Sequence, residues 1–215
     1  MTTPYVAVPS DGRVGPGVLV LHAWWGLNQT FRGVCDRLAE AGFVALAPDL
    51  YGDGAIATTV ADAEARVGSA DRAAMGARAA ASLDELLAHP AVIGRQVGVI
   101  GFSLGAMWAL HLSQRRPEIA AATVFYGSMN DDYAASHAAY LGHFAPGDDW
   151  EPDEEVAAME ASIRRGGRDI TAYRYPGTSH WFFEPDRPEY DAAPAELAWT
   201  RTIAFLREQL GPLGA

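Results

Sequence analysis

The stretch that decides the fold is Val97–Leu110, VGVIGFSLGAMWAL, in which a single serine joins two apolar segments. The first segment, Val97–Phe102, is almost continuously apolar, as is typical of a strand buried on both faces. The second segment, Leu104–Gln114, has a helical pattern and begins directly after Ser103. Glycines two residues before and two residues after the serine allow the strand and the helix to pack close to a sharp turn. The sequence therefore predicts a strand, an exposed serine and a helix in immediate succession.

The rest of the chain continues this alternation of apolar runs and helical patterns. The other predicted strands are Val18–His22, Phe43–Ala47, Thr123–Tyr126, Leu141–Ala145 and Ile170–Tyr175. The other predicted helices are Thr30–Ala41, Val60–Ala88, which Gly68 or Gly76 divides, Pro152–Arg164 and Asp191–Leu210. Strands that alternate with helices predict an α/β fold with a mostly parallel central sheet and helices on both faces. We expect residues 1–215 to form a single domain of this kind, because no linker or repeat interrupts the pattern.

Composition narrows the classes of function. The 215 residues carry a net charge of −11, and the lack of a Lys/Arg cluster argues against nucleic acid or anionic lipid as a partner. Cys35 is the only cysteine, so no intrachain disulfide is possible, and we expect it to pack in the core. The N-terminus does not resemble a secretory signal, and no run approaches ~18 apolar residues. We expect a cytoplasmic protein, a monomer or a small homo-oligomer, that binds a small molecule.

The serine at the turn is a candidate nucleophile. Gly101–Gly105 matches G-x-S-x-G, which presents a serine hydroxyl at the top of a sheet. A glycine-rich turn with an idle serine is the competing interpretation. The dipole of the following helix favours negative charge beside Ser103, and the Leu104 N–H is the first candidate oxyanion donor. We expect the second donor in the loop after the early strand, and choose the Trp24 N–H.

A serine nucleophile needs a histidine base, which in turn needs an acidic partner. Of the six histidines, His180 is the best candidate, because it follows a predicted strand on a loop where ligands meet open α/β sheets. His143 lies inside a predicted strand, where a core position is expected. The acid is expected after Leu141–Ala145, where Asp148 and Asp149 are both available. The residues alone leave this choice open.

Taken together, five segments resemble the dienelactone hydrolase family over most of the chain. They are VLVLHAWWGLN, GFVALAPDLYGDG, VGVIGFSLGAMWAL, LGHFAPGDDWEPDEEV and YPGTSHWFFEPDRPEYDAAPAELAWTRTIAFL. The resemblance implies an α/β-hydrolase fold, with the family's nucleophile at Ser103 and its histidine at His180. The family's aspartate lies four residues before the proline that opens the next helix. That spacing selects Asp148 over Asp149.

Three positions depart from the family pattern. Members similar to this chain use a cysteine nucleophile where Ser103 stands, and a glutamate that helps to activate the thiol where Ala23 stands. The two changes are consistent with each other, because a serine relies on a histidine base. The family also holds the carboxylate of dienelactone with arginines, one shortly after the histidine, whereas here the first is Arg187. Arg72 and Arg78 are the candidates for such a carboxylate clamp in this chain. The competing interpretation is that each is a solvent-exposed helix residue.

These expectations combine into a serine hydrolase that cleaves a small carboxylic ester or lactone through Ser103, His180 and Asp148. Aromatic residues beside the predicted strand ends are candidates for its substrate pocket: Trp25, Phe102, Tyr126, Trp150, Trp181 and Phe182. We expect no metal and no cofactor, because no ligand spacing, dinucleotide fingerprint or P-loop occurs. The alternatives are a non-catalytic small-molecule-binding relative, another acyl transferase or peptidase on the same fold, and a scaffold protein.

Overall fold

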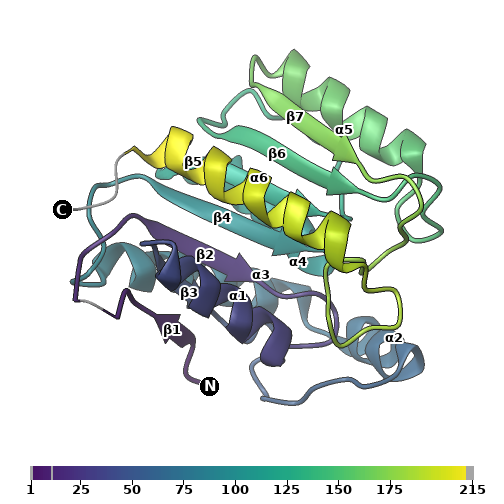
Figure 1. Cartoon of the computed structure of the whole chain (residues 1–215), viewed down its shortest axis with the longest axis horizontal. Coiled ribbons are helices and arrows are strands. Elements are labelled where there is room, and N and C mark those ends of the chain that lie inside the picture. The colour runs from purple at the N-terminus through teal and green to yellow at the C-terminus, as the bar shows by residue number, and fades with distance from the viewer. Residues whose placement is uncertain (1, 11, 212–215) are drawn as a thin grey trace.

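The computed structural model describes residues 2–10 and 12–211, and within these ranges seven strands form one sheet (Figure 1). In chain order the strands are β1 (Tyr5–Ala7), β2 (Gly17–Leu21), β3 (Val44–Ala47), β4 (Val97–Phe102), β5 (Ile119–Phe125), β6 (Ala139–Phe144) and β7 (Ile170–Arg174). They are arranged β1-β3-β2-β4-β5-β6-β7. Every neighbouring pair is parallel except β1–β3, which is antiparallel. The predicted mostly parallel sheet is confirmed.

Helices cover both faces of the sheet. They are α1 (Gln29–Glu40), α2 (Val60–Ser69), α3 (Arg72–Ala88), α4 (Leu104–Ser113), α5 (Asp153–Arg165) and α6 (Ala192–Leu210). Along β2 the side chains alternate: Val18 and Val20 pack in the core beneath α1 and α6, whereas Leu19 and Leu21 pack in the core beneath α3, α4 and α5. A strand buried on both faces must be apolar at every position, which explains the continuous run at β2.

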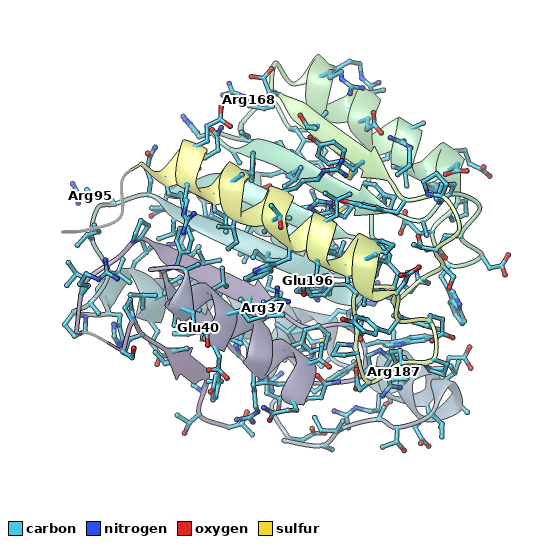
Figure 2. The ribbon with its side chains drawn as sticks, in the orientation of Figure 1. Arg37, Glu40, Arg95, Arg168, Arg187 and Glu196 are labelled. Atoms are coloured by element: carbon cyan, nitrogen blue, oxygen red, sulfur yellow. The ribbon has the colours of Figure 1, made fainter. Side chains whose placement is uncertain are left out.

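The helices α1 and α6 lie side by side over one face (Figure 1). Figure 2 shows Arg37 of α1 close to Glu196 of α6, and their side chains form an ion pair of 2.8 Å. The Arg37 guanidinium also lies 4.3 Å from the centroid of the Trp199 ring. The contact with the Trp199 ring orients the Arg37 guanidinium. Because both charged side chains are partly exposed, the ion pair adds only about 0.2–1 kcal/mol.

Most predicted elements agree with the structure to within one or two residues, and the larger differences concern β1, the helical segment before β4, and β5. The antiparallel strand β1 was not predicted, since it is three residues long and only Ala7 is buried. The long helical segment is divided after Ser69, near Gly68 and not at Gly76, because Asp71 caps α3 by accepting a hydrogen bond from the Ala74 N–H. Strand β5 begins at Ile119, four residues before the predicted start.

The parallel strands bring their carboxyl ends to one edge of the sheet. The segments that follow β2, β4, β6 and β7 contain Trp24, Ser103, Asp148 and His180 respectively. In open α/β sheets this edge is where ligands bind.

Candidate active site

Close backbone contacts fix the turn that carries Ser103. A Cβ atom added to Gly105 would lie 2.1 Å from the Leu21 carbonyl oxygen, and one added to Gly101 would lie 2.3 Å from the Gly105 carbonyl oxygen. Both glycines are therefore required for α4 to pack directly against β2 and β4. Ser103 between them has φ +49° and ψ −111°, a strained conformation for a non-glycine residue. Its N–H donates to the Phe125 carbonyl at 2.9 Å, which ties the turn to β5.

The structure brings Ser103, His180 and Asp148 together in one hydrogen-bonded series. His180 Nε2 lies 3.0 Å from Ser103 Oγ, and His180 Nδ1 lies 2.7 Å from Asp148 Oδ2. An ionised carboxylate only accepts, so Nδ1 carries the proton and Nε2 accepts from the serine hydroxyl. The second oxygen of Asp148 accepts from the Trp150 N–H at 2.9 Å. Asp148 and His180 are buried, whereas Asp149 is exposed and Ser103 remains partly accessible.

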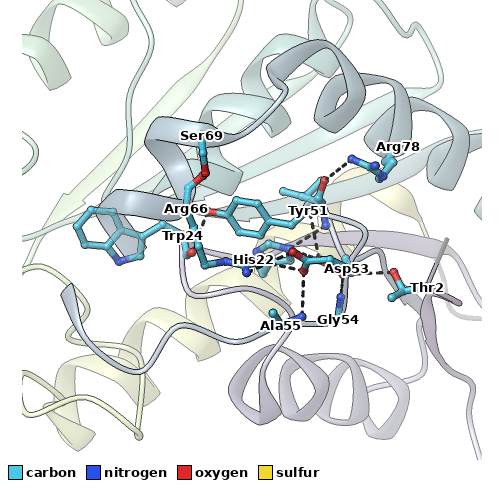
Figure 3. Close-up of polar contacts among 12 residues, drawn as sticks. Thr2, His22, Trp24, Tyr51, Asp53, Gly54, Ala55, Arg66, Ser69 and Arg78 are labelled. Atoms are coloured by element: carbon cyan, nitrogen blue, oxygen red, sulfur yellow. Dashed lines mark hydrogen bonds and ion pairs between the residues drawn. The ribbon is translucent and has the colours of Figure 1, made fainter. Parts of the chain in front are cut away.

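The two predicted oxyanion donors lie on the expected elements. Leu104 is the first residue of α4, where a backbone N–H has no partner within its own helix. Trp24 lies in a turn after β2, in which the Gly26 N–H donates to the Ala23 carbonyl. The carbonyl of Trp24 accepts from the Tyr51 hydroxyl at 2.9 Å, which orients this peptide segment (Figure 3).

A histidine that might be taken for a catalytic or metal-binding group supports this turn instead. His22 Nε2 accepts from the Leu50 N–H at 2.9 Å, and Nδ1 therefore donates to the Ala23 carbonyl at 2.6 Å. The ring is fully buried and stacks on Tyr51, with centroids 5.8 Å apart. Arg78 donates to the Leu50 carbonyl at 3.1 Å (Figure 3), so this arginine holds a loop and is not directed at the site.

His143 has a comparable structural role in the core. Its Nδ1 lies 2.8 Å from the Tyr175 hydroxyl and its Nε2 lies 3.0 Å from the Thr202 hydroxyl. Burial lowers the pKa of His143 to about 3. The ring is therefore neutral, as a satisfied core histidine should be.

The predicted pocket aromatics occupy two different environments. Trp25, Phe102, Tyr126 and Phe182 are at most 1% exposed and belong to the core beneath the site. Trp150 is 46% exposed, and its ring lies 5.0 Å from Trp24 and 5.7 Å from Trp181. The Trp181 ring also meets the His180 ring edge to face at 5.0 Å. The three tryptophans form a cluster beside the candidate base.

An apolar pocket of about 170 Å³ lies beside α4. Its lining comes from α2, α3, α4 and the segment after β5: Val67, Ala70, Arg72, Met75, Leu104, Met107, Trp108, His111 and Met129. Leu104 directly follows Ser103. Met129 lies two residues after Gly127, where an added Cβ would be 2.7 Å from the Ser103 carbonyl oxygen. The pocket is therefore lined by the residue next to the nucleophile, whereas Ser103 itself is not among the lining residues.

Sequence reasoning missed two carboxyl groups in the surroundings of the base, Glu151, which is half-buried, and Glu184, which is buried. Glu151 hydrogen-bonds the Ser128 hydroxyl, and burial raises its pKa. Glu184 is completely buried and accepts a hydrogen bond of 2.7 Å from the Tyr126 hydroxyl. A glutamate in a loop is usually solvated, so nothing in the sequence indicated this burial.

Comparison with known proteins shows the family of this chain. The family model described as "Dienelactone hydrolase family" matches residues 3–210. The chain belongs to the dienelactone hydrolase family. The family resemblance and the α/β-hydrolase fold predicted from the sequence are thus confirmed.

Three similar proteins illustrate the family. "Protein usf" of Aquifex pyrophilus is 32% identical and the match covers 96% of this chain and 93% of that protein. A "Probable 2-oxo-3-(5-oxofuran-2-ylidene)propanoate lactonase" of a Bradyrhizobium species is 28% identical over 96% of this chain and 89% of its own. The solved structure of a dienelactone hydrolase-like promiscuous phosphotriesterase from metagenomic libraries superposes with a TM-score of 0.82 at 29% identity, covering 94% of this chain and 91% of that one.

Metal-binding clusters and membrane-spanning helices are both absent from residues 2–10 and 12–211. No group of three or more His, Cys, Asp or Glu side chains there is arranged to hold a metal ion. Within the same residues, no helix combines the length and the apolar character that crossing a membrane requires.

Proposed function

We propose that this member of the dienelactone hydrolase family is a serine hydrolase that cleaves a small carboxylic ester or lactone. The observation that carries the proposal is the series Ser103–His180–Asp148, with contacts of 3.0 and 2.7 Å in the order that acyl transfer requires. The lactonase name of the Bradyrhizobium relative supports the ester class of substrate.

In the proposed reaction, His180 Nε2 takes the proton of Ser103 as Oγ attacks the carbonyl carbon. Asp148 accepts from Nδ1, holds the ring in the required tautomer and stabilises the imidazolium. The Leu104 and Trp24 N–H groups bind the oxyanion, each contributing about 3 kcal/mol to transition-state stabilisation. His180 then protonates the leaving alcohol, and water attacks the acyl-enzyme to release the acid.

The apolar pocket beside Leu104 would hold the hydrocarbon part of the substrate. An apolar cavity of ~150 Å³ takes a molecule the size of benzene, so about 170 Å³ suits a compact group of similar size. Arg72 is the one charged residue among the lining residues, and it is exposed at the pocket. Of the two arginines considered as a carboxylate clamp, Arg72 is the one left available, since Arg78 is bonded to Leu50.

The test is hydrolysis of a panel of p-nitrophenyl esters and small lactones by the wild-type protein and by Ser103→Ala. We expect turnover by the wild type and none above background in the variant, because the nucleophile is gone while the fold remains. Ser69→Ala is the matched control, since the exposed Ser69 hydroxyl donates to the Ala65 and Arg66 carbonyls of its own helix, and it should retain most of the activity. Full activity in Ser103→Ala would refute the proposal.

A further inference from the structure

Glu184 is a buried carboxyl that the reaction described above does not use. It lies four residues after His180 and has no exposed surface. Its Oε1 atom accepts from the Tyr126 hydroxyl at 2.7 Å, whereas its Oε2 atom has no hydrogen-bond partner among the described residues. A buried oxygen without a partner costs free energy. The fold therefore keeps this carboxyl in place at a cost in stability.

Tyr126 connects Glu184 to the candidate base. The tyrosine follows β5 with φ +37°, a conformation that costs backbone energy for a non-glycine residue. Its ring is fully buried and lies 4.8 Å from the His180 ring, centroid to centroid, at an interplanar angle of 56°. One end of the side chain is held by Glu184, and its ring packs at a tilt against the imidazole. Movement of Glu184 would thus be transmitted to His180.

We propose that Glu184 is a positioning residue for His180. Its hydrogen bond fixes the Tyr126 ring against the imidazole, and ionisation of the carboxyl strengthens that hydrogen bond, because hydrogen bonds to a charged acceptor are stronger than neutral ones. The inference rests on the proposed function, because it assigns a role beside the same base. It also gives a role to a carboxyl that contacts Tyr126, although Ala23 occupies the position that follows β2.

The charge of Glu184 depends on pH near neutrality. Burial raises the pKa of Glu184 to about 8. The hydrogen bond from Tyr126 lowers this pKa, but its effect is smaller than that of burial. Asp186 raises this pKa, and Arg187, which lies 4.2 Å above the Trp25 ring, lowers it. The Trp25 indole N–H also lowers the pKa of Glu184, although its geometry falls short of a hydrogen bond.

Other charged groups face His180 from the acid side of the site. Asp148 is bonded directly to the imidazole, and Glu151 lies close enough that His180 lowers its pKa while burial raises it. These two groups come from the segment between β6 and α5, whereas Glu184 comes from the segment before α6. A change at Glu184 can therefore be separated from changes at either of them.

The experiment measures how fast a fluorophosphonate labels Ser103 between pH 6 and pH 10. Labelling requires the same proton transfer to His180, with fluoride as the leaving group, and needs no knowledge of the natural substrate. In the wild type we expect the rate constant to rise roughly three- to tenfold across an ascending limb near pH 8, as Glu184 ionises. In Glu184→Gln this limb should be absent. In Tyr126→Phe it should move to higher pH, because the hydrogen bond that lowers the pKa of Glu184 is lost.

Matched controls separate this effect from a loss of packing. Glu160→Gln removes a carboxyl that pairs with Arg164 and Arg174 on α5 and β7, and Tyr140→Phe removes a buried hydroxyl bonded to serines in the other core. Both should keep the wild-type profile. If Glu184→Gln does not fold, the shifted limb of Tyr126→Phe provides the test.

The outcomes distinguish the two proposals. If Glu184→Gln keeps the ascending limb of the wild-type pH profile, the positioning role is overturned and the serine hydrolase proposal stands. The same holds for an unshifted limb in Tyr126→Phe, if Glu184→Gln does not fold. A wild-type protein that is not labelled at all overturns the proposed function itself, and the role of Glu184 with it.

Discussion

Replacing Glu184 by glutamine should change how the stability of the protein depends on pH. The carboxyl has no exposed surface, and burial raises its pKa from 4.5 to about 8. The folded state therefore binds this proton more tightly than the unfolded chain. The resulting contribution to the free energy of unfolding is complete below pH 4.5 and is lost progressively as the pH rises through about 8. At ~1.4 kcal/mol per pH unit, the loss amounts to roughly 3–6 kcal/mol.

Glutamine has nearly the same shape and cannot ionise, so it avoids this loss. At pH 5 the wild type and Glu184→Gln should have similar free energies of unfolding, because both side chains are neutral. At pH 9 the variant should be more stable than the wild type by roughly 3–6 kcal/mol, a large share of the ~5–15 kcal/mol that holds a typical domain together. Above about pH 8 the ionised form of Glu184 is thus maintained at the expense of stability.

Urea denaturation followed by circular dichroism at pH 5, 7 and 9 measures this difference. Glu160→Gln is the control, since that carboxyl is largely paired with arginines near the surface, and its stability should follow the wild type in parallel. Parallel pH dependences for the wild type and Glu184→Gln would refute the reasoning, because they would mean that the buried carboxyl does not change its protonation on unfolding.

Three other changes test other parts of the structure. Asp148→Asn should reduce kcat by about 10⁴-fold, the scale of the same change in a serine protease triad, whereas Asp149→Asn should have little effect; ester hydrolysis measures both. Gly105→Ala should abolish soluble expression or cooperative unfolding, because the added Cβ would lie 2.1 Å from the Leu21 carbonyl oxygen; well-folded protein would show that α4 can move away from β2. Met107→Trp should fill the apolar pocket and lower kcat/KM for bulky esters more than for acetates, which a series of esters of increasing acyl length would measure. Equal losses across the series would mean that the substrate binds outside this pocket.

The sequence was sufficient for the strands and helices whose burial leaves a clear pattern. Strands β2 and β4 are apolar at every position because both faces are covered, and the serine turn is recognisable because its glycines have no room for a Cβ. The edge strand β1 buries one residue of three and so leaves no such pattern. The division between α2 and α3 falls beside Gly68, one of the two predicted positions, and the capping contact of Asp71 sets where α3 begins.

The sequence was enough to choose the candidate nucleophile, base and acid. It was not enough to predict which side chains surround them. The order of serine, acid and histidine along the chain selected Ser103 and His180, and the family spacing selected Asp148 over its neighbour. The burial of Glu184 follows from how the loop after His180 folds under Tyr126. The separation of the pocket aromatics into core and rim depends on the same packing, because each ring alone fits either environment.

The most direct test of the central claim is to identify the residue that carries the acyl group. The protein is mixed with a p-nitrophenyl ester that it hydrolyses, quenched in acid within the first turnover and digested, and the peptides are analysed by mass spectrometry. We predict one acyl adduct, on Ser103, in the wild type and none in Ser103→Ala. Sustained hydrolysis by Ser103→Ala, or an adduct on a residue other than Ser103, would contradict the account.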